Sequence, residues 1–394
     1  MSNVYHGSCW RFLKDLLRDG VRSPRRVFRE MLGLPHYPTA ALERHFRVLL
    51  EMAERGDLTA ATQYACTVAE EALQRGDAQT LSLMSRPLER LEAYGPQARY
   101  FRASRQLSRP AAKDWDGSAL LDGTLVVDYK YRTVGLPLRH ARLLAPAAAR
   151  AKRCVALTER RLVPLYQRTF PDVELRAVED DHAALFAAAD AITTYTDLLA
   201  FFAPDAATIA ASFLPLRADP LVRQELRRRY ESRGTGPFIG LSWGSSNRAK
   251  DAPSFSHWSP LLQATPGTFV TLQYGDIERA MHKLGRWVPG RLLRDESVDQ
   301  MRDMDRFAAQ VASLDAVIST SNTIAHLAGA LGVPSVVVLN DNLYQVWPFR
   351  GATIAWNPRT VLIHKHGRAW PVVLQEAQVQ LRRVLDAVAP PEPR

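Results

Sequence analysis

The segment from residue 315 to residue 339 constrains this chain most, because a strand, a polar loop, a helix and a second strand follow one another within it. It reads DAVISTSNTIAHLAGALGVPSVVVL. The runs DAVIS and SVVVL are typical of neighbouring parallel strands that are buried on both faces. The residues between them, TSNT at 320–323, are types that cap helix N-termini, and Gly332 marks where the helix ends. The segment predicts a βαβ unit.

A helix that begins at the C-terminal edge of a parallel sheet is suited to an anion. Its first N–H groups have no partner within the helix, and its dipole favours negative charge at that end. His326 lies in the first turn of the predicted helix, where its imidazole N–H can point at the same anion. A histidine on an ordinary helix surface is the alternative. We therefore predict a phosphate site over residues 320–326.

Composition is typical of a soluble, folded protein. Of 394 residues, 46% are hydrophobic and 23% are charged, and no apolar run approaches the roughly 18 residues of a membrane span. Charges interrupt the N-terminal segment where a signal peptide would need an apolar core. Cys9, Cys66 and Cys154 stand far apart without metal-ligand spacing, so we expect reduced thiols, no metal and a cytoplasmic location.

The chain carries a formal net charge of +10, from 51 Lys and Arg against 41 Asp and Glu. A basic protein can bind nucleic acid. Here the arginines are spread along the chain, and no helix-turn-helix, zinc-finger or RNP pattern accompanies them. We expect an anionic small molecule as the partner, and no nucleic acid.

The first part of the chain divides into an arm, residues 1–36, and a helical region, residues 37–110. The helical region contains four segments with apolar residues at helical spacing, each ending at Gly-Asp, Gly-Pro or a polar turn. Short turns and alanines are typical of tetratricopeptide-type hairpins, although no fixed repeat of about 34 residues is present. We expect antiparallel helix pairs that present or recruit an acceptor.

From residue 111 onward, strand and helix signals alternate, which predicts parallel sheets. The first alternation, residues 111–232, begins with the strand-like GTLVVDY, and the second, residues 233–394, begins with FIGLSW. The chain closes with the amphipathic helix PVVLQEAQVQLRRVLDAVA. The predicted fold class is α/β, with two Rossmann-like, doubly wound domains that face a cleft and follow an all-α region.

Polar loops follow three predicted strands of the second domain, at the edge where ligands bind in a doubly wound sheet. One is the TSNT loop. Another begins at Trp243 and continues through Gly244 and Ser245, with Arg248 and Lys250 close behind. Backbone amides of small residues followed by two cations suit a diphosphate, because the amides provide geometry and the cations charge. A solvated turn is the alternative.

The third loop follows TFVTLQ. Gln273 and Tyr274 there are candidates for contact with a base or ribose, and the alternative for the tyrosine is a place in the core. Asp276 is more simply an N-cap of the next helix than a catalytic group. Trp347, in a later aromatic loop, either stacks on a base or anchors its loop in the core.

The motifs LSWGSSN, TFVTLQYGD and LDAVISTSNTIAHLAGALGVP resemble the C-terminal half of bacterial glycosyltransferases with tetratricopeptide-type N-terminal regions, relatives of heptosyltransferases and O-linked N-acetylglucosamine transferases. The resemblance extends from about Trp115 to the C-terminus. It implies a GT-B fold and transfer from a nucleotide-diphosphate sugar, with a UDP-type donor favoured, no cofactor and no metal. By the same resemblance Ser321, Asn322, Thr323 and His326 hold the diphosphate, and Gln273 and Tyr274 line the nucleotide cleft.

The first domain departs from that family pattern. Trp115, Gly117, Leu120 and Gly123 match its opening segment, and the Ala-Arg pair follows at residues 141–142. The loop before that pair, however, has Gly135-Leu136 where the family has Gly-Asp. The carboxylate that would deprotonate the attacking hydroxyl is therefore missing from its usual place, and Asp128 and His140 are the candidate replacements.

Three functions compete on this evidence. The first is an inverting glycosyltransferase acting on a protein or glycan. The second is a catalytically silent nucleotide-sugar-fold module used for binding or assembly, which the missing carboxylate favours. The third, a scaffold that works only through the helical region, leaves the predicted phosphate site without a purpose.

Overall fold

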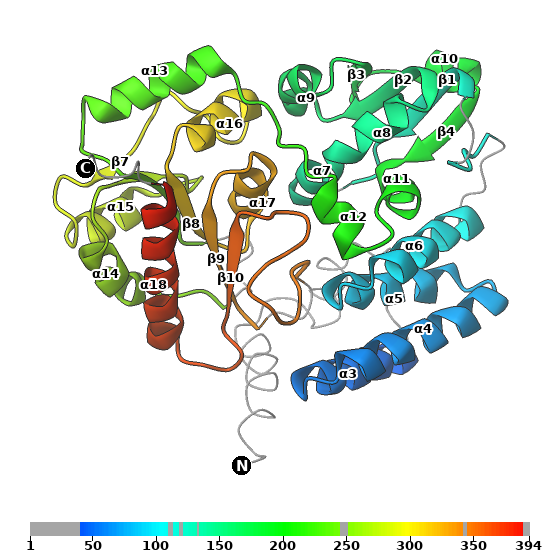
Figure 1. Ribbon diagram of the computed structural model, residues 1–394, viewed down its shortest axis with the longest axis horizontal. Helices are drawn as coiled ribbons and strands as arrows, with labels where there is room; N and C mark the ends of the chain where they lie inside the picture. The colour runs from blue at the N-terminus through cyan, green and yellow to red at the C-terminus, as the bar shows by residue number, and fades with distance from the viewer. Residues whose placement is uncertain are drawn as a thin grey trace.

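The structure is a computed structural model that describes residues 40–108, 113–117, 121–131, 134–244, 251–341 and 345–388. The predicted N-terminal arm lies outside these residues. Figure 1 shows three parts: helices α3 to α6, a four-stranded sheet with its helices, and a six-stranded sheet with its helices. This order confirms the predicted α/β class, in which an all-α region precedes two parallel sheets. The residue limits of the domains stay predictions.

The helical region consists of two antiparallel helix pairs. Gly56 and Gly76 in the turns adopt left-handed backbone, with φ of 85° and 67°, which a side chain would disfavour. An aspartate follows each glycine and caps the next helix through its carboxylate, Asp57 on α4 and Asp77 on α5. The repeated Gly-Asp pair thus ends one helix and begins the next. The helices are α3 (Ala40–Glu54), α4 (Leu58–Gln74), α5 (Ala78–Arg90) and α6 (Tyr94–Ser108).

The first sheet has the order β3-β2-β1-β4, and all its pairs are parallel. The first strand lies between the second and the fourth, so the switch point of this sheet lies between β1 and β4. The strands are β1 (Leu121–Asp128), β2 (Ala151–Thr158), β3 (Val173–Ala177) and β4 (Ala191–Thr194). Its helices are α7 (Gly135–His140), η1 (Ala141–Leu143), α8 (Leu144–Ala148), η2 (Arg160–Leu162), α9 (Val163–Thr169), α10 (Ala183–Ala188), α11 (Tyr195–Phe202) and α12 (Ala206–Ala211).

The second sheet has the order β10-β9-β8-β5-β6-β7, also parallel throughout. Counted from β5, this is the six-stranded Rossmann order, with its switch point between β5 and β8. The strands are β5 (Phe238–Ser242), β6 (Thr268–Thr271), β7 (Leu292–Leu293), β8 (Ala316–Thr320), β9 (Ser335–Leu339) and β10 (Thr360–His364). Its helices are α13 (Pro220–Glu231), α14 (Phe255–Ala264), α15 (Glu278–Gly285), α16 (Met304–Ala312), α17 (Thr323–Ala330) and α18 (Trp370–Val388). Strand β10 was not predicted from the sequence.

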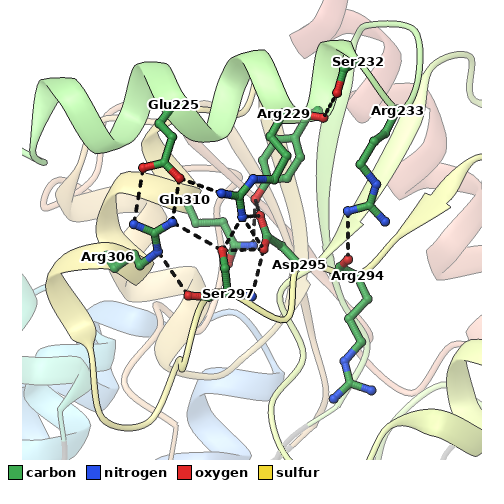
Figure 2. A network of polar contacts seen from close by, with 10 residues as sticks. Glu225, Arg229, Ser232, Arg233, Arg294, Asp295, Ser297, Arg306 and Gln310 are labelled. Carbon is green, nitrogen blue, oxygen red and sulfur yellow. Dashed lines mark hydrogen bonds and ion pairs between the residues drawn. The ribbon is translucent and has the colours of Figure 1, made fainter.

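Helix α13 follows the first sheet and is tied to the second by a polar network. Figure 2 shows Glu225 between two guanidinium groups, 2.6 Å from Arg229 and 2.9 Å from Arg306. Arg229 continues to the buried Asp295, 3.1 Å away, which also accepts from the Ser297 hydroxyl. Charges alternate in sign through this network, so α13 is held to α16 and to the loop after β7.

One hydrophobic core is shared by all three parts of the molecule. Tyr94 and Ala98 of α6 belong to the same buried cluster as the strands of the first sheet and the α17 side of the second. A separate cluster fills the opposite face of the second sheet, beneath α14, α15 and α18. The helical region has in addition a small core of its own. It therefore packs as an integral part of the protein.

Helix α6 is also joined to the first sheet by charge. Arg105 lies between two carboxylates, 2.9 Å from Asp114 and 2.8 Å from Asp197. Asp197, in the first turn of α11, is 1% exposed. Burial raises the pKa of Asp197, and Arg105 opposes that rise.

Two further expectations concern the whole chain. Cys66 and Cys154 are free thiols, and burial raises the pKa of both; Cys9 lies outside the described residues. Among the helices that the structure describes, none combines the length and the apolar character needed to cross a bilayer.

We predict that Asp197→Asn lowers the free energy of unfolding by about 3 kcal/mol, because it breaks an ion pair to a buried carboxylate and leaves Arg105 with Asp114 alone. Urea unfolding followed by circular dichroism measures this. Asp122→Asn is the control, since its pair with Lys152 is exposed and such pairs contribute at most about 1 kcal/mol. Equal losses in both variants would contradict the view that the α6 to α11 junction depends on a buried ion pair.

Candidate functional site

The candidate site lies at the switch point of the six-stranded sheet. Strands β5 and β8 are neighbours, and they end together at Ser242 and Thr320. The chain leaves these two strands toward opposite sides of the sheet, and ligands of doubly wound folds bind in the crevice that results. The TSNT loop and the loop after Trp243 both begin here, as the sequence predicted.

Asn322 caps helix α17. Its Oδ1 accepts hydrogen bonds from the N–H groups of Ile324, at 2.9 Å, and Ala325, at 3.3 Å. Within the described part of the chain, the N–H groups of Asn322 itself and of Thr323 donate to no protein acceptor. The helix N-terminus therefore keeps two backbone donors for a ligand, which is the arrangement that favours an anion.

The other end of the Asn322 amide joins the two loops. Its Nδ2 donates to the Ser242 hydroxyl, at 2.8 Å, and to the Gly244 carbonyl, at 2.9 Å. Gln273, at the end of β6, accepts from the Gly244 N–H at 3.0 Å and from the Ser242 hydroxyl at 3.1 Å. The sequence analysis predicted both residues, Asn322 and Gln273, to bind the sugar donor. In the structure their side-chain amides hold the loop after β5.

The other residues that were predicted to bind the sugar donor lie in different surroundings. Ser245, Arg248 and Lys250 lie outside the described residues. Trp243 is buried and packs on Phe255 of α14, with ring centroids 6.2 Å apart. Tyr274 is half-buried against the shared core. Asp276 lies one residue before the N-cap of α15 and accepts from the Glu278 N–H at 3.4 Å, so it supports the start of that helix.

His326 projects from the first turn of α17 into the boundary with the first domain. Its ring stacks on Trp347, with centroids 4.7 Å apart and planes 4° from parallel. The indole N–H of Trp347 donates to the Ser321 hydroxyl at 2.8 Å, and the indole is fully buried. Trp347 therefore anchors its loop and supports His326.

Arg139 of α7 meets His326 from the first domain. Its Nη2 lies 3.4 Å from the imidazole Nδ1. A guanidinium only donates, so Nδ1 is the acceptor and the ring proton resides on Nε2. Arg139 is fully buried, and it also bonds Glu89 of α5 at 2.9 Å and the Val346 carbonyl at 3.2 Å. Burial lowers the pKa of Arg139, and Glu89 opposes that fall.

Gly135 explains how α7 comes so close to α17. A Cβ atom at this position would lie 2.6 Å from Cδ2 of His326, so any side chain would displace either the His326 ring or the helix. Helix α7 therefore begins directly against the first turn of α17. The Gly135-Leu136 pair, where the family pattern has Gly-Asp, thus includes a glycine that this contact requires.

The two candidate bases lie in the first domain. Asp128 ends β1, at the switch point of its own sheet, and pairs with Lys130. His140 ends α7, is 2% exposed, and receives a contact from the Tyr131 hydroxyl at its Nδ1. Burial, Arg139 and Arg142 hold the pKa of His140 well below its usual value, so its imidazole is neutral at pH 7.

Sequence reasoning missed Arg139 and Glu89. The signal for Arg139 is the polar stretch RHAR between the apolar residues of GLPLRHARLL. Glu89, a glutamate in an amphipathic helix, has none. Both act through partners that are remote in the chain. Among the described residues, no group of three or more His, Cys, Asp or Glu is arranged to hold a metal ion.

Comparison with known proteins adds two kinds of likeness. No protein-family model matches the chain. Protein FlbA of Caulobacter vibrioides is 35% identical over 192 residues, which represent 45% of this chain and 32% of FlbA. The chain thus corresponds to about a third of that relative's length.

Several solved structures share the general architecture at low identity. A family 9 glycosyl transferase from Veillonella parvula covers 68% of this chain and 98% of its own, at 13% identity and a TM-score of 0.48. The ADP-heptose LPS heptosyltransferase II of E. coli covers 67% and 99%, at 12% identity and 0.49. A mutant O-GlcNAc transferase from Thermobaculum terrenum covers 89% and 95%, at 13% identity and 0.32.

We predict that Asn322→Ala lowers the free energy of unfolding by about 2 to 4 kcal/mol, because it removes a helix cap and leaves buried partners unpaired. Asp303→Ala is the matched control, since the Asp303 side chain caps α16 through the Arg306 N–H. We expect it to cost about 1 kcal/mol. Urea unfolding of both variants gives the difference, and equal losses would mean that the bonds to Ser242 and Gly244 add nothing.

The low pKa of His140 predicts a pH dependence of stability. Because the pKa of His140 in the folded protein lies below the ordinary histidine value of about 6.5, the unfolded chain takes up a proton first as pH falls. The contribution of this group to stability is complete well above pH 6.5 and is lost as the pH falls through and below 6.5, by about 1.4 kcal/mol at pH 5.5. His140→Gln should remove that loss when unfolding at pH 7.5 and 5.5 is compared. His282→Gln, on the exposed surface of α15, should not.

Proposed function

We propose that this protein is a glycosyltransferase, related to heptosyltransferases and O-linked N-acetylglucosamine transferases, that moves a sugar from a nucleotide-diphosphate donor to a protein or glycan acceptor. The observation that carries the proposal is the N-terminus of α17 at the β5/β8 switch point. Two backbone N–H groups there donate to no acceptor among the described residues, and the imidazole of His326 follows one turn later. This is a site for an anion, and the diphosphate is the anionic part of the donor.

In this proposal the diphosphate lies against the N-terminus of α17. The hydroxyls of Ser321 and Thr323 and the Nε2 proton of His326 contact its oxygens, and Arg248 and Lys250 add positive charge from the loop after β5. Asn322 and Gln273 shape that loop, while Tyr274 borders the nucleotide. A UDP-type donor is our first choice. Hydrogen-bond donors aimed at the charge that develops on the leaving diphosphate provide the main catalytic effect without a metal.

The transfer we propose is a single inverting displacement. The acceptor hydroxyl attacks the anomeric carbon, the bond from that carbon to the diphosphate oxygen breaks, and the nucleoside diphosphate leaves. Asp128 takes the hydroxyl proton, because its place at the end of β1 is the switch point of the acceptor-side sheet. His140 is the weaker candidate, since its Nδ1 already contacts Tyr131 in the interior. The surface of the helical region recruits the acceptor in the cytoplasm.

One observation favours the alternative, a catalytically silent module that binds nucleotide sugars. Gly135 packs so closely on His326 that the first turn of α17 is covered from the first domain. Leu136 follows, where the family has its carboxylate. A protein that had lost the base and closed this boundary would bind a donor without turning it over.

The test is donor hydrolysis and donor binding by the full chain. We expect slow release of nucleoside diphosphate from at least one of UDP-N-acetylglucosamine, UDP-glucose, GDP-mannose and ADP-heptose. His326→Gln should reduce turnover by about one to two decades, since one charge-assisted hydrogen bond contributes about 1.5 to 3 kcal/mol.

His282→Gln, an exposed histidine on α15, serves as the matched control and should leave turnover unchanged. Calorimetry with UDP, GDP and ADP separates the outcomes. Tight binding without turnover would support the silent module. Absence of both binding and turnover across the whole panel would refute the donor site.

A further inference from the structure

The last two residues of α5 reach the boundary between the two sheets. Glu89 accepts from Arg139 Nη1 at 2.9 Å, and its side chain is 11% exposed. The next residue, Arg90, donates from Nε to the Trp347 carbonyl at 3.1 Å. Its guanidinium also lies over the Phe349 ring, 3.7 Å from the centroid. Arg139 and Trp347 both contact the His326 ring. The helical region thus holds both of these neighbours of His326.

Charge explains why Arg139 needs a partner from α5. Arg90, Arg139 and Arg142 are all buried near this boundary, with exposures of 8%, 0% and 4%. Arg142 bonds the Trp356 carbonyl and lies over the Trp356 ring, so its partner is not a carboxylate. A buried guanidinium without a counterion is costly, and it moves toward water or toward another acceptor when it has the freedom to do so. Glu89 is the carboxylate that holds Arg139 here.

Trp347 and Arg139 act on the plane and on the protonation of the His326 ring. Trp347 fixes its plane by stacking at 4.7 Å, and Arg139 fixes its proton by donating to Nδ1 at 3.4 Å. With Nδ1 engaged as acceptor, the ring proton lies on Nε2. Both supporting residues are themselves held by α5, through Glu89 and Arg90.

We infer that the helical region is part of the donor site: Glu89 is a positioning residue that acts through Arg139 to set the orientation and the protonated nitrogen of His326. This goes beyond recruitment of an acceptor, because the helices then control the chemistry of the site from within. The consequence for catalysis rests on the proposed function, whereas the consequence for the His326 ring does not.

The first test is spectroscopic and needs no substrate. Histidine-selective 15N labelling of the full chain reports the two ring nitrogens of His326, which are assigned by their loss in His326→Gln. We expect a non-protonated Nδ1 and a protonated Nε2 in the wild type. In Arg139→Met and in Glu89→Gln the ring should exchange between tautomers, which moves both shifts toward intermediate values.

Two further variants keep this test decisive. The double variant Glu89→Gln/Arg139→Met removes both charges of this pair, so neither is left without its partner, which guards against simple misfolding, and it should show the same averaged shifts. Glu70→Gln is the matched control, because Glu70 pairs with Arg99 and accepts from Tyr100 within the helical region. It should leave the His326 shifts as in the wild type. Wild-type shifts in the folded double variant would overturn the inference.

The second test measures turnover. In the donor-hydrolysis assay, Glu89→Gln should lower kcat about tenfold, with a smaller change in KM. A tenfold loss corresponds to about 1.4 kcal/mol of lost transition-state stabilisation. Glu70→Gln should keep wild-type kcat. If wild-type kcat persisted in Glu89→Gln, the positioning role would be wrong even if the enzyme were active. If the wild type turned over no donor, the proposed function would fail, and the spectra alone would decide this inference.

Discussion

The hydrogen bonds of one buried guanidinium, that of Arg139, link the helical region, the first domain and the second domain beside His326. They join a carboxylate from the helical region, a carbonyl from the loop before Trp347 and the ring of His326. A charge that is removed from water keeps a fixed position only when every partner stays in place. The relative placement of the helical region and both sheets therefore depends on this residue as much as on apolar packing.

The shared core has a consequence for how the protein works. Because Tyr94 and the strands of the first sheet belong to one buried cluster, the helical region and the α/β domains fold as one unit. If the proposed function holds, an acceptor bound on the outer helix surfaces would be sensed through α5, whose last two residues contact Arg139 and Trp347. Binding and chemistry would then be linked through a short, rigid path. The Arg105 pair with Asp197 reinforces the same junction.

Regular elements were predictable because their signals are local. The predicted C-terminal amphipathic helix and the strand SVVVL match α18 and β9, since buried parallel strands and amphipathic helices show their pattern directly. Strand β10 was missed because TVLIH follows an aromatic, Pro-containing loop and was included in it. The site residues stay predictions. For Asn322, expected at the diphosphate, the structure adds that its side-chain amide caps α17 and joins Ser242 to Gly244.

The sequence by itself determined the βαβ unit, the cap residues before α17 and the edge of the sheet where they gather. Each of these follows from residues within one or two turns of each other, so composition and spacing are sufficient. Only the tertiary structure decided what surrounds His326. Its partner Arg139 is 187 positions away, and Glu89 lies a further 50 positions from Arg139. Such contacts arise from the packing of three separate parts, and no local pattern records which distant side chains that packing brings together.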